Sequence, residues 1–191
     1  LSVSSAASDV YKRQLNDNFK IKRIVISTYQ STSGAGKKPM DELIDQTKSI
    51  LNNKSFEVKN FTKQIAFNAI PHIDSFSDDG YTKEELKMIK ETNKILGTKI
   101  DITATCVRIP VLVSHAESVN IEFENDFSIK KVKELLNTAE GCKVVDENSD
   151  GGYITPVDAE GKNETFISRI RKDNSKKNSL NTVSYTHLRA H

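Results

Sequence analysis

The sequence contains too few cysteines to form a disulfide scaffold. Cys106 and Cys142 are its two cysteines in 191 residues, and their spacing fits no metal-binding motif. Tryptophan is absent, and no apolar run approaches the roughly 18 residues of a membrane-spanning helix. A net charge of +2 provides no basic excess, which argues against nucleic acid as a partner. We therefore expect no metal, membrane or nucleic-acid partner, and a cytoplasmic protein whose cysteines stay reduced.

The chain is long enough for one domain with a hydrophobic core, since 36% of its residues are hydrophobic and 28% are charged. Its two ends differ from the middle. Residues 1–14 and 182–191 are rich in small and polar residues, and both resemble translated adapter sequence. We predict that they are non-native tails that pack against nothing, because neither carries periodic apolar residues. Tyr11 and Tyr185 should accordingly be exposed, and residues 15–181 are the predicted native domain, truncated at both ends.

Strands and helices alternate between these ends. Strands are predicted at 21–28, 101–113 and 117–124, and in the shorter runs CKVVDE and ETFISRIRKD. Helices are predicted at 39–52, 82–97 and 128–139. The second helix is the best marked, with Thr82 and Glu85 as a capping box and Gly97 as a stop. The predicted fold class is α+β: a mixed, mostly antiparallel sheet with helices packed on one face.

The stretch CVRIPVLVSH, residues 106–115, has an arginine inside an apolar run and a histidine at its end. Strict alternation along a strand places Arg108 and His115 on opposite faces, so they can meet only if the chain bends, for which Pro110 is a plausible place. An edge strand with an exposed arginine is the simpler alternative. However, an arginine charge cannot be buried unpaired, and no acidic residue lies within the five positions before Arg108.

We therefore predict an anion site at this stretch. Arg108 and His115 should point into one solvent-reachable concavity, with Gln30 and the helix turn of Glu84 and Lys87 along its rim. Because the apolar run ends at His115, its ring should be solvated and titrate near neutral pH.

A second small motif is STYQSTSGAG, residues 27–36, where a strand ends and a glycine-containing turn begins. Gly34 and Gly36 can adopt positive φ and let a ligand approach the backbone closely. Gln30 at the strand end can both donate and accept hydrogen bonds. On sequence alone an ordinary turn between strand and helix is the favoured explanation, and the glycine spacing is neither a P-loop nor a dinucleotide fingerprint.

The remaining candidates have simple structural explanations. Glu84 and Lys87 lie three residues apart on a predicted helix, and a solvated ion pair on the helix surface is their simplest explanation. Cys106 in an apolar strand is expected to be an inert core thiol, because burial raises the pKa of a thiol.

Four segments together resemble the aspartate-semialdehyde dehydrogenase family. VISTYQSTSGAG, EELKMIKETNKILG, ITATCVRIPVLVSHAESVNIE and TFISRIRKD follow one another in the family's order, and the resemblance covers nearly all of 15–175. It implies the C-terminal catalytic and dimerisation domain, with a fold like that of the glyceraldehyde-3-phosphate dehydrogenase C-terminal domain. The implied enzyme is a cytoplasmic homodimer. It converts 4-aspartyl phosphate to L-aspartate 4-semialdehyde and phosphate with NADP as cofactor, for lysine (through diaminopimelate), methionine and threonine biosynthesis.

The resemblance implies catalytic roles for His115 and Gln30. His115 matches the family's general acid/base, and Gln30 matches the glutamine that orients the substrate near the thioester. Arg108 matches the arginine that binds the substrate's α-carboxylate, for which a planar guanidinium provides two parallel hydrogen bonds.

The resemblance also implies substrate and cofactor contacts. Glu84 matches the acidic group that meets the α-ammonium, and Lys87 matches a cation at the phosphate subsite. Ser33 and Gly34 match the turn that touches the nicotinamide end of NADP.

The sequence lacks two features of the family. The nucleophilic cysteine of an Asn-Cys turn is missing, and so is the G-x-G-x-x-G turn of the cofactor domain. We therefore predict that the isolated chain is inactive. Three alternatives stay open: a non-catalytic dimerisation domain, an enzyme of the N-acetylglutamyl-phosphate reductase type, and a thiol enzyme that uses Cys106 with His115.

Overall fold

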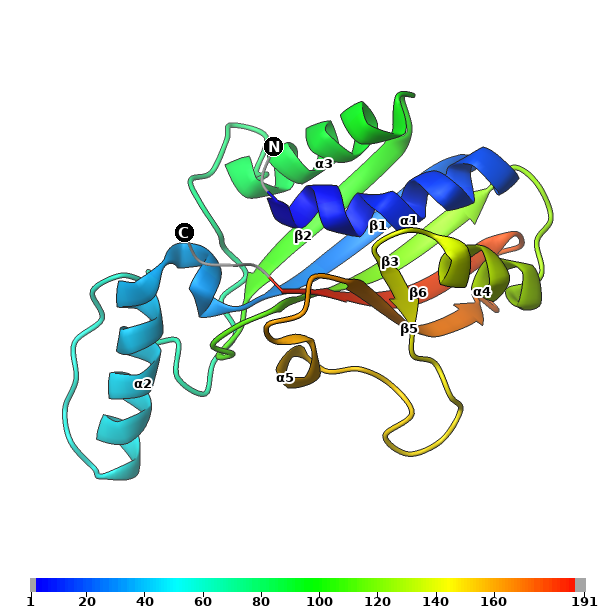
Figure 1. Ribbon diagram of the computed structural model, residues 1–191. Coiled ribbons are helices and arrows are strands. Elements are labelled where there is room, and N and C mark those ends of the chain that lie inside the picture. The colour runs from blue at the N-terminus through cyan, green and yellow to red at the C-terminus, as the bar shows by residue number, and fades with distance from the viewer. Residues whose placement is uncertain (1–2, 188–191) are drawn as a thin grey trace.

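One six-stranded sheet organises the protein in a computed structural model that describes residues 3–187, with side chains from Val10 onward (Figure 1). The strands are β1 (Ile21–Gln30), β2 (Asp101–Arg108), β3 (His115–Phe123), β4 (Cys142–Val144), β5 (Thr165–Lys172) and β6 (Ser179–Thr186). The helices are α1 (Val3–Phe19), the short 3₁₀ helix η1 (Thr32–Ala35), α2 (Lys37–Leu51), α3 (Lys83–Leu96), α4 (Ile129–Thr138) and α5 (Pro156–Ala159).

The sheet is mixed, with the strand order β2-β1-β3-β6-β5-β4. The pairs β1–β3, β3–β6 and β5–β6 are antiparallel, whereas β1–β2 and β4–β5 are parallel. Helices α1, α3 and α4 lie over one face of the sheet (Figure 1). The predicted class, a mixed and mostly antiparallel sheet with helices on one face, is therefore confirmed.

The main core lies between this helical layer and the sheet. Alternate strand residues point to the same face, so Ile24 and Ile26 of β1 lie beside Val119 and Ile121 of β3 beneath the helices. The helices contribute buried side chains that include Met88 of α3 and Val132 and Leu136 of α4.

The predicted cap of α3 is present. Glu85 N donates to Thr82 Oγ1 at 3.4 Å and Thr82 N donates to Glu85 Oε2 at 2.8 Å, while Gly97 ends the helix with φ of 67°. The other carboxylate oxygen, Glu85 Oε1, accepts from the backbone N–H of Cys106 at 2.9 Å. The cap therefore fixes the first turn of α3, which includes Glu84, against strand β2.

The strand predicted at 101–113 is shorter than expected and ends at Arg108. Pro110 has no N–H with which to continue a ladder, and the carbonyls of Val111 and Leu112 instead accept from Thr32 N and Ser33 N at 2.8 and 2.9 Å. The chain therefore turns between Arg108 and His115, and His115 begins the next strand, β3. Since the two residues are not on one strand, strict alternation does not place them on opposite faces.

The prediction that both ends pack against nothing is wrong. Tyr11, Leu15 and Phe19 are four residues apart, so they form one stripe on α1 that is buried in the core. Residues 182–186 belong to β6, in which Thr182, Ser184 and Thr186 are buried and Tyr185 is half-buried. Residues 1–2 and 188–191 of the predicted tails lie outside the described residues. The non-native origin of the two segments remains a prediction.

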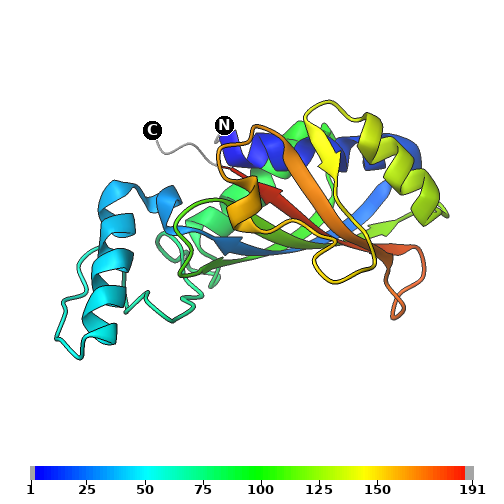
Figure 2. The same ribbon diagram turned by 60° about the horizontal axis from the view of Figure 1, so that its bottom comes forward.

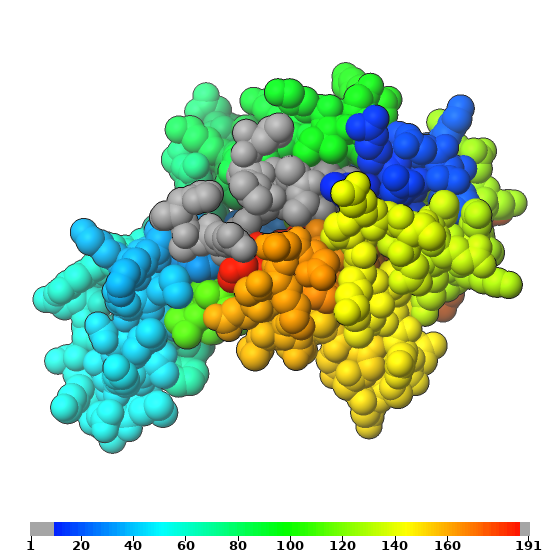
Figure 3. Space-filling model, viewed as in Figure 1, coloured from blue at the N-terminus to red at the C-terminus, as the bar shows by residue number. Residues whose placement is uncertain are grey.

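The segment from α2 to residue 70 forms a small lobe beyond the end of the sheet (Figures 1 and 3). Leu43, Ile65, Ala66 and Ile70 form its own core. The buried Gln46 side chain holds the irregular stretch by accepting from Ile65 N at 2.9 Å and Ala66 N at 3.2 Å. Ile70 in turn pairs with Arg108 through two backbone hydrogen bonds of 2.9 Å, which join the lobe to the end of β2.

Truncation of Tyr11 should destabilise the protein strongly. The ring is fully buried, so we expect Tyr11→Ala to lower the free energy of unfolding by about 3–5 kcal/mol, as for other large core side chains. Val10 is 38% exposed and provides the matched control, since Val10→Ala should change stability by less than about 0.5 kcal/mol. Urea unfolding of the two variants measures the difference, and equal, small effects would show that α1 does not pack as described.

Candidate active site

Three strand termini meet at one edge of the sheet. Gln30 ends β1 and Arg108 ends β2, and the two are partners in the parallel pairing. His115 begins β3, whose antiparallel register pairs its next residue, Ala116, with Tyr29. The structure thus brings together the three residues that were predicted to share a site from positions as far as 85 residues apart.

His115 is buried at this edge, and the expectation that its ring is solvated and titrates near neutral pH is wrong. Its Nδ1 atom lies 3.1 Å from Ser31 N, which donates to it, and 2.9 Å from Ser31 Oγ, which in turn lies 3.0 Å from Ser33 Oγ. Burial, and to a smaller extent the positive charge of Arg108, lower the pKa of His115 to about 3. The ring is therefore neutral at physiological pH.

Arg108 is also buried, with 7% of its surface exposed. Its Nη1 donates to the carbonyl oxygen of Ser31 at 2.5 Å, which is its one side-chain hydrogen bond within residues 10–187. Burial lowers the pKa of Arg108, whereas the carboxylate of Glu84 acts in the opposite direction. A guanidinium carries five N–H donors, and this hydrogen bond uses one of them.

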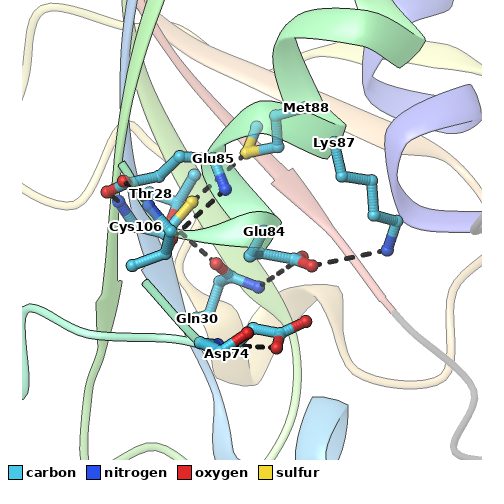
Figure 4. A network of polar contacts seen from close by, with 10 residues as sticks. Thr28, Gln30, Asp74, Glu84, Glu85, Lys87, Met88 and Cys106 are labelled. Atoms are coloured by element: carbon cyan, nitrogen blue, oxygen red, sulfur yellow. Dashed lines mark hydrogen bonds and ion pairs between the residues drawn. The ribbon is translucent and has the colours of Figure 1, made fainter. Parts of the chain in front are cut away.

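A chain of side chains leads from β1 to helix α3 (Figure 4). Thr28 Oγ1 donates to Gln30 Oε1 at 3.0 Å, which turns the amide NH₂ toward Glu84 Oε1 at 3.3 Å. Lys87 Nζ reaches the other oxygen of Glu84 at 3.4 Å, so the predicted ion pair is present. Glu84 and Lys87 are more exposed than Arg108 and Gln30, and they form the outer part of the arrangement.

The turn after β1 covers His115 and Arg108. Ser33 is buried, whereas Gly34 is exposed. A Cβ atom on Gly34 would lie 2.9 Å from His115 Nε2 and 3.2 Å from Arg108 Nη1, which is too close for an unstrained side chain. Gly34 is thus required by close approach rather than by positive φ, and the predicted positive φ occurs at Gly36, at 101°.

Ser31 is the residue that sequence reasoning missed. It follows Gln30 directly, and it contacts both His115 and Arg108 through its backbone and its hydroxyl. The only sequence signal was its position at the end of a strand, next to a residue already singled out.

Cys106 lies behind the site and is unsuited to nucleophilic attack. Its side chain is fully buried, its Sγ lies 3.5 Å from Met88 Sδ, and burial raises the pKa of its thiol to about 12 (Figure 4). These observations argue against a thiol enzyme that uses Cys106 with His115. In the part of the chain that the structure describes, no group of three or more His, Cys, Asp or Glu side chains could hold a metal ion, and no helix could cross a membrane.

Residues 13–187 match the protein family described as semialdehyde dehydrogenase, dimerisation domain. The aspartate-semialdehyde dehydrogenase of Rickettsia typhi is 50% identical over 169 residues, which are 88% of this chain and 50% of that protein. The protein of the same name from Aquifex aeolicus is 47% identical over 163 residues, which are 84% of this chain and 48% of that protein. The chain spans about half the length of the curated relatives that it matches.

Solved structures show the same fold. Aspartate semialdehyde dehydrogenase II of Vibrio cholerae has a TM-score of 0.93 at 39% identity, covering 97% of this chain and 55% of that chain. A second structure of the Vibrio cholerae protein, complexed with ASA, gives the same values.

The neutral His115 should make the protein less stable in acid. The pKa of its ring is about 3 in the folded chain, against 6.5 for an unperturbed histidine. The unfolded chain therefore binds this proton first, so the contribution of His115 to stability is complete above about pH 6.5 and is lost as the pH falls toward 3. At about 1.36 kcal/mol per pH unit, on the order of 2 kcal/mol should be lost between pH 6.5 and 5.

Urea unfolding of the original chain and of His115→Gln across this pH range measures the effect. The variant has no ring to protonate at this position. Between pH 6.5 and 5 its free energy of unfolding should therefore fall by on the order of 2 kcal/mol less than that of the original chain. Identical pH dependences of the original chain and His115→Gln would contradict the buried, neutral state of the ring.

Proposed function

The chain belongs to the semialdehyde dehydrogenase family through its dimerisation domain, and from this premise we propose that it recognises the substrate of an NADP-dependent aspartate-semialdehyde dehydrogenase. The proposed reaction is the reductive dephosphorylation of 4-aspartyl phosphate to L-aspartate 4-semialdehyde. The two cysteines, both free thiols, support a cytoplasmic location.

The observation that carries the proposal is the buried guanidinium of Arg108, which uses one hydrogen bond within the described residues and faces the edge where Gln30 and Glu84 meet. An amino acid presents a carboxylate and an ammonium group close together. We assign the α-carboxylate to Arg108, because the fork of a guanidinium can bind it with two hydrogen bonds. We assign the α-ammonium to Glu84 and the phosphate to Lys87, which carry the complementary charges.

Gln30 and His115 are proposed to act at the reacting carbonyl. The amide of Gln30 is held in one orientation by Thr28, which suits a role in placing the substrate. His115 has the position of an acid/base group, beside Arg108 and beneath Gly34.

Gly34 is exposed and lies directly against His115, so we assign the nicotinamide end of NADP to the outer side of this turn, at Ser33 and Gly34. NADPH, when bound, supplies the hydride of the reaction. We further propose that this chain turns over no substrate by itself. The inert Cys106 is the cysteine at this edge of the sheet, and a nucleophile would have to come from outside the chain.

Replacement of Arg108 by lysine should weaken substrate binding. A lysine keeps the charge but replaces the fork by a point charge, so we expect Arg108→Lys to raise the Kd for L-aspartate 4-semialdehyde by roughly 10- to 100-fold. Titration calorimetry on this chain measures the change. Arg171→Lys, an exposed arginine on β5, is the matched control and should leave the Kd unchanged.

An unchanged Kd in Arg108→Lys would refute the assignment of the carboxylate, and absence of binding by the original chain would refute the substrate-recognition role. In an enzyme that carries this chain together with its nucleophile, Arg108→Lys should raise KM, whereas His115→Ala should chiefly lower kcat.

We also propose that the chain forms a homodimer through the sheet face opposite the helical layer. In Figure 2, strands β1, β2 and β3 carry no long helix on this side. The open face is defined by half-buried and exposed residues in register on neighbouring strands: Val25, Ser27, Tyr29, Thr103, Thr105, Val107, Ser118, Asn120, Asn181 and Val183. Because the family is a dimerisation domain, a second copy of the chain is the proposed occupant.

A charge in the centre of the open face should abolish the dimer. Val25 lies on β1 between Thr103 and Asn120, so Val25→Asp would bury a carboxylate in the proposed interface. Sedimentation equilibrium should show a dimer for the original chain and a monomer for Val25→Asp. The control Val58→Asp, an exposed valine in the α2 lobe, should remain dimeric. A monomeric original chain, or a dimeric Val25→Asp, would count against this interface.

A further inference from the structure

A backbone N–H and a hydroxyl group converge on one nitrogen of His115. The backbone N–H of Ser31 donates to Nδ1 at 3.1 Å, and Ser31 Oγ lies 2.9 Å from the same atom. A backbone N–H can only donate, so Nδ1 must present its lone pair. The opposite ring orientation would place a carbon, Cδ2, against the N–H and leave a buried donor unpaired, which is costly.

From this geometry we propose that Ser31 is a positioning residue that holds His115 as a neutral ring with its proton on Nε2, so that His115 meets the reacting group as a hydrogen-bond donor. The identity of the reacting group, an acyl or aldehyde oxygen, rests on the proposed function, whereas the location of the proton does not.

The surroundings of Nδ1 also oppose the charged form of the ring. An imidazolium carries a proton on both nitrogens, and a proton on Nδ1 would point at the N–H of Ser31. Burial and the nearby guanidinium of Arg108 lower the pKa of the ring, whereas a backbone hydrogen bond with Ser114 raises it, and the net shift favours the neutral ring. The Ser33 hydroxyl, 3.0 Å from Ser31 Oγ, completes a chain of hydroxyl groups that ends at Nδ1.

The opposite nitrogen, Nε2, lies directly against Gly34, where a Cβ atom would be only 2.9 Å away. Gly34 is exposed, so the reacting group is placed beside Nε2 at the border of this turn. A hydrogen on Nε2 can therefore polarise a carbonyl oxygen without transferring a proton, in the way that neutral histidines act in other enzymes.

Nitrogen-15 NMR of the histidine-labelled chain tests the tautomer directly, because protonated and unprotonated ring nitrogens have distinct chemical shifts and couplings. At pH 7 we expect Nδ1 of His115 to be the unprotonated nitrogen and Nε2 to carry the proton, with no change of this pattern between pH 5 and 8. A proton on Nδ1, or titration of the ring near pH 6.5, would overturn the proposal.

Substitutions of Ser31 separate positioning from simple structural support. Ser31→Ala removes the hydroxyl donor but keeps the backbone donor, so the population of the Nδ1–H tautomer relative to Nε2–H should rise roughly two- to tenfold, as expected for one lost hydrogen bond. Ser31→Thr keeps a hydroxyl and should restore the original ratio. The matched control is Ser114→Ala, since the Ser114 hydroxyl is next to His115 in sequence, is buried and makes no hydrogen bond in the structure.

An unchanged tautomer ratio in Ser31→Ala, or an equal change in Ser114→Ala, would refute the role of the Ser31 hydroxyl. Addition of L-aspartate 4-semialdehyde then tests the donor role, because the Nε2 proton should exchange more slowly with water when it is hydrogen-bonded to the ligand. Faster or unchanged exchange in the presence of bound ligand would refute the donor role. Failure of the ligand to bind refutes the proposed function alone and leaves the tautomer result intact.

Discussion

The hydrogen bond from Arg108 to the carbonyl oxygen of Ser31 joins the end of β2 to the turn after β1, and the site depends on it. A guanidinium taken out of water needs acceptors, since an unpaired buried charge is very costly. The protein supplies one backbone carbonyl and a carboxylate, Glu84, at longer range. The hydrogen bond to Ser31 uses one of the five N–H donors of the guanidinium, at the edge of the sheet where Gln30 and His115 also lie. Ser31 then uses its N–H and hydroxyl for His115, so that one residue orders both functional groups.

Helix α3 and the Gln30 amide are coupled in a similar way. The capping box of α3 uses one oxygen of Glu85 for the helix N-terminus and the other for the backbone of β2. The helix therefore cannot rotate without loss of a buried hydrogen bond. This rigidity places Glu84 within 3.3 Å of Gln30, whose amide is turned by Thr28. The outer pair of Glu84 and Lys87 would be an ordinary surface ion pair on an isolated helix, but here one of its carboxylate oxygens faces the site.

Features that depend on neighbouring residues could be predicted from the sequence. The cap of α3 and the overall α+β class follow from local spacing, and the structure confirms them. Features that depend on distant contacts could not. The hydrogen bond from Ser31 to the buried His115 spans 84 residues, and hydrogen bonds from residues 32 and 33 hold the turn that follows β2. The α1 stripe was missed for another reason: Tyr11, Leu15 and Phe19 are helically spaced, but the polar residues between them dominate the composition.

The register of β1 links the two surfaces of the domain. Tyr29 and Gln30 are consecutive, so they point to opposite faces of the sheet, Tyr29 to the open face and Gln30 to the edge of the site. A slip of one residue would turn every side chain of the strand to the wrong face. The parallel pairing with β2 and the antiparallel pairing with β3 fix this register from both sides. The hydrogen bonds of β1 that bring Arg108 and His115 together therefore also determine which residues lie on the open face. A change in the register of β1 would alter both the candidate active site and the open face.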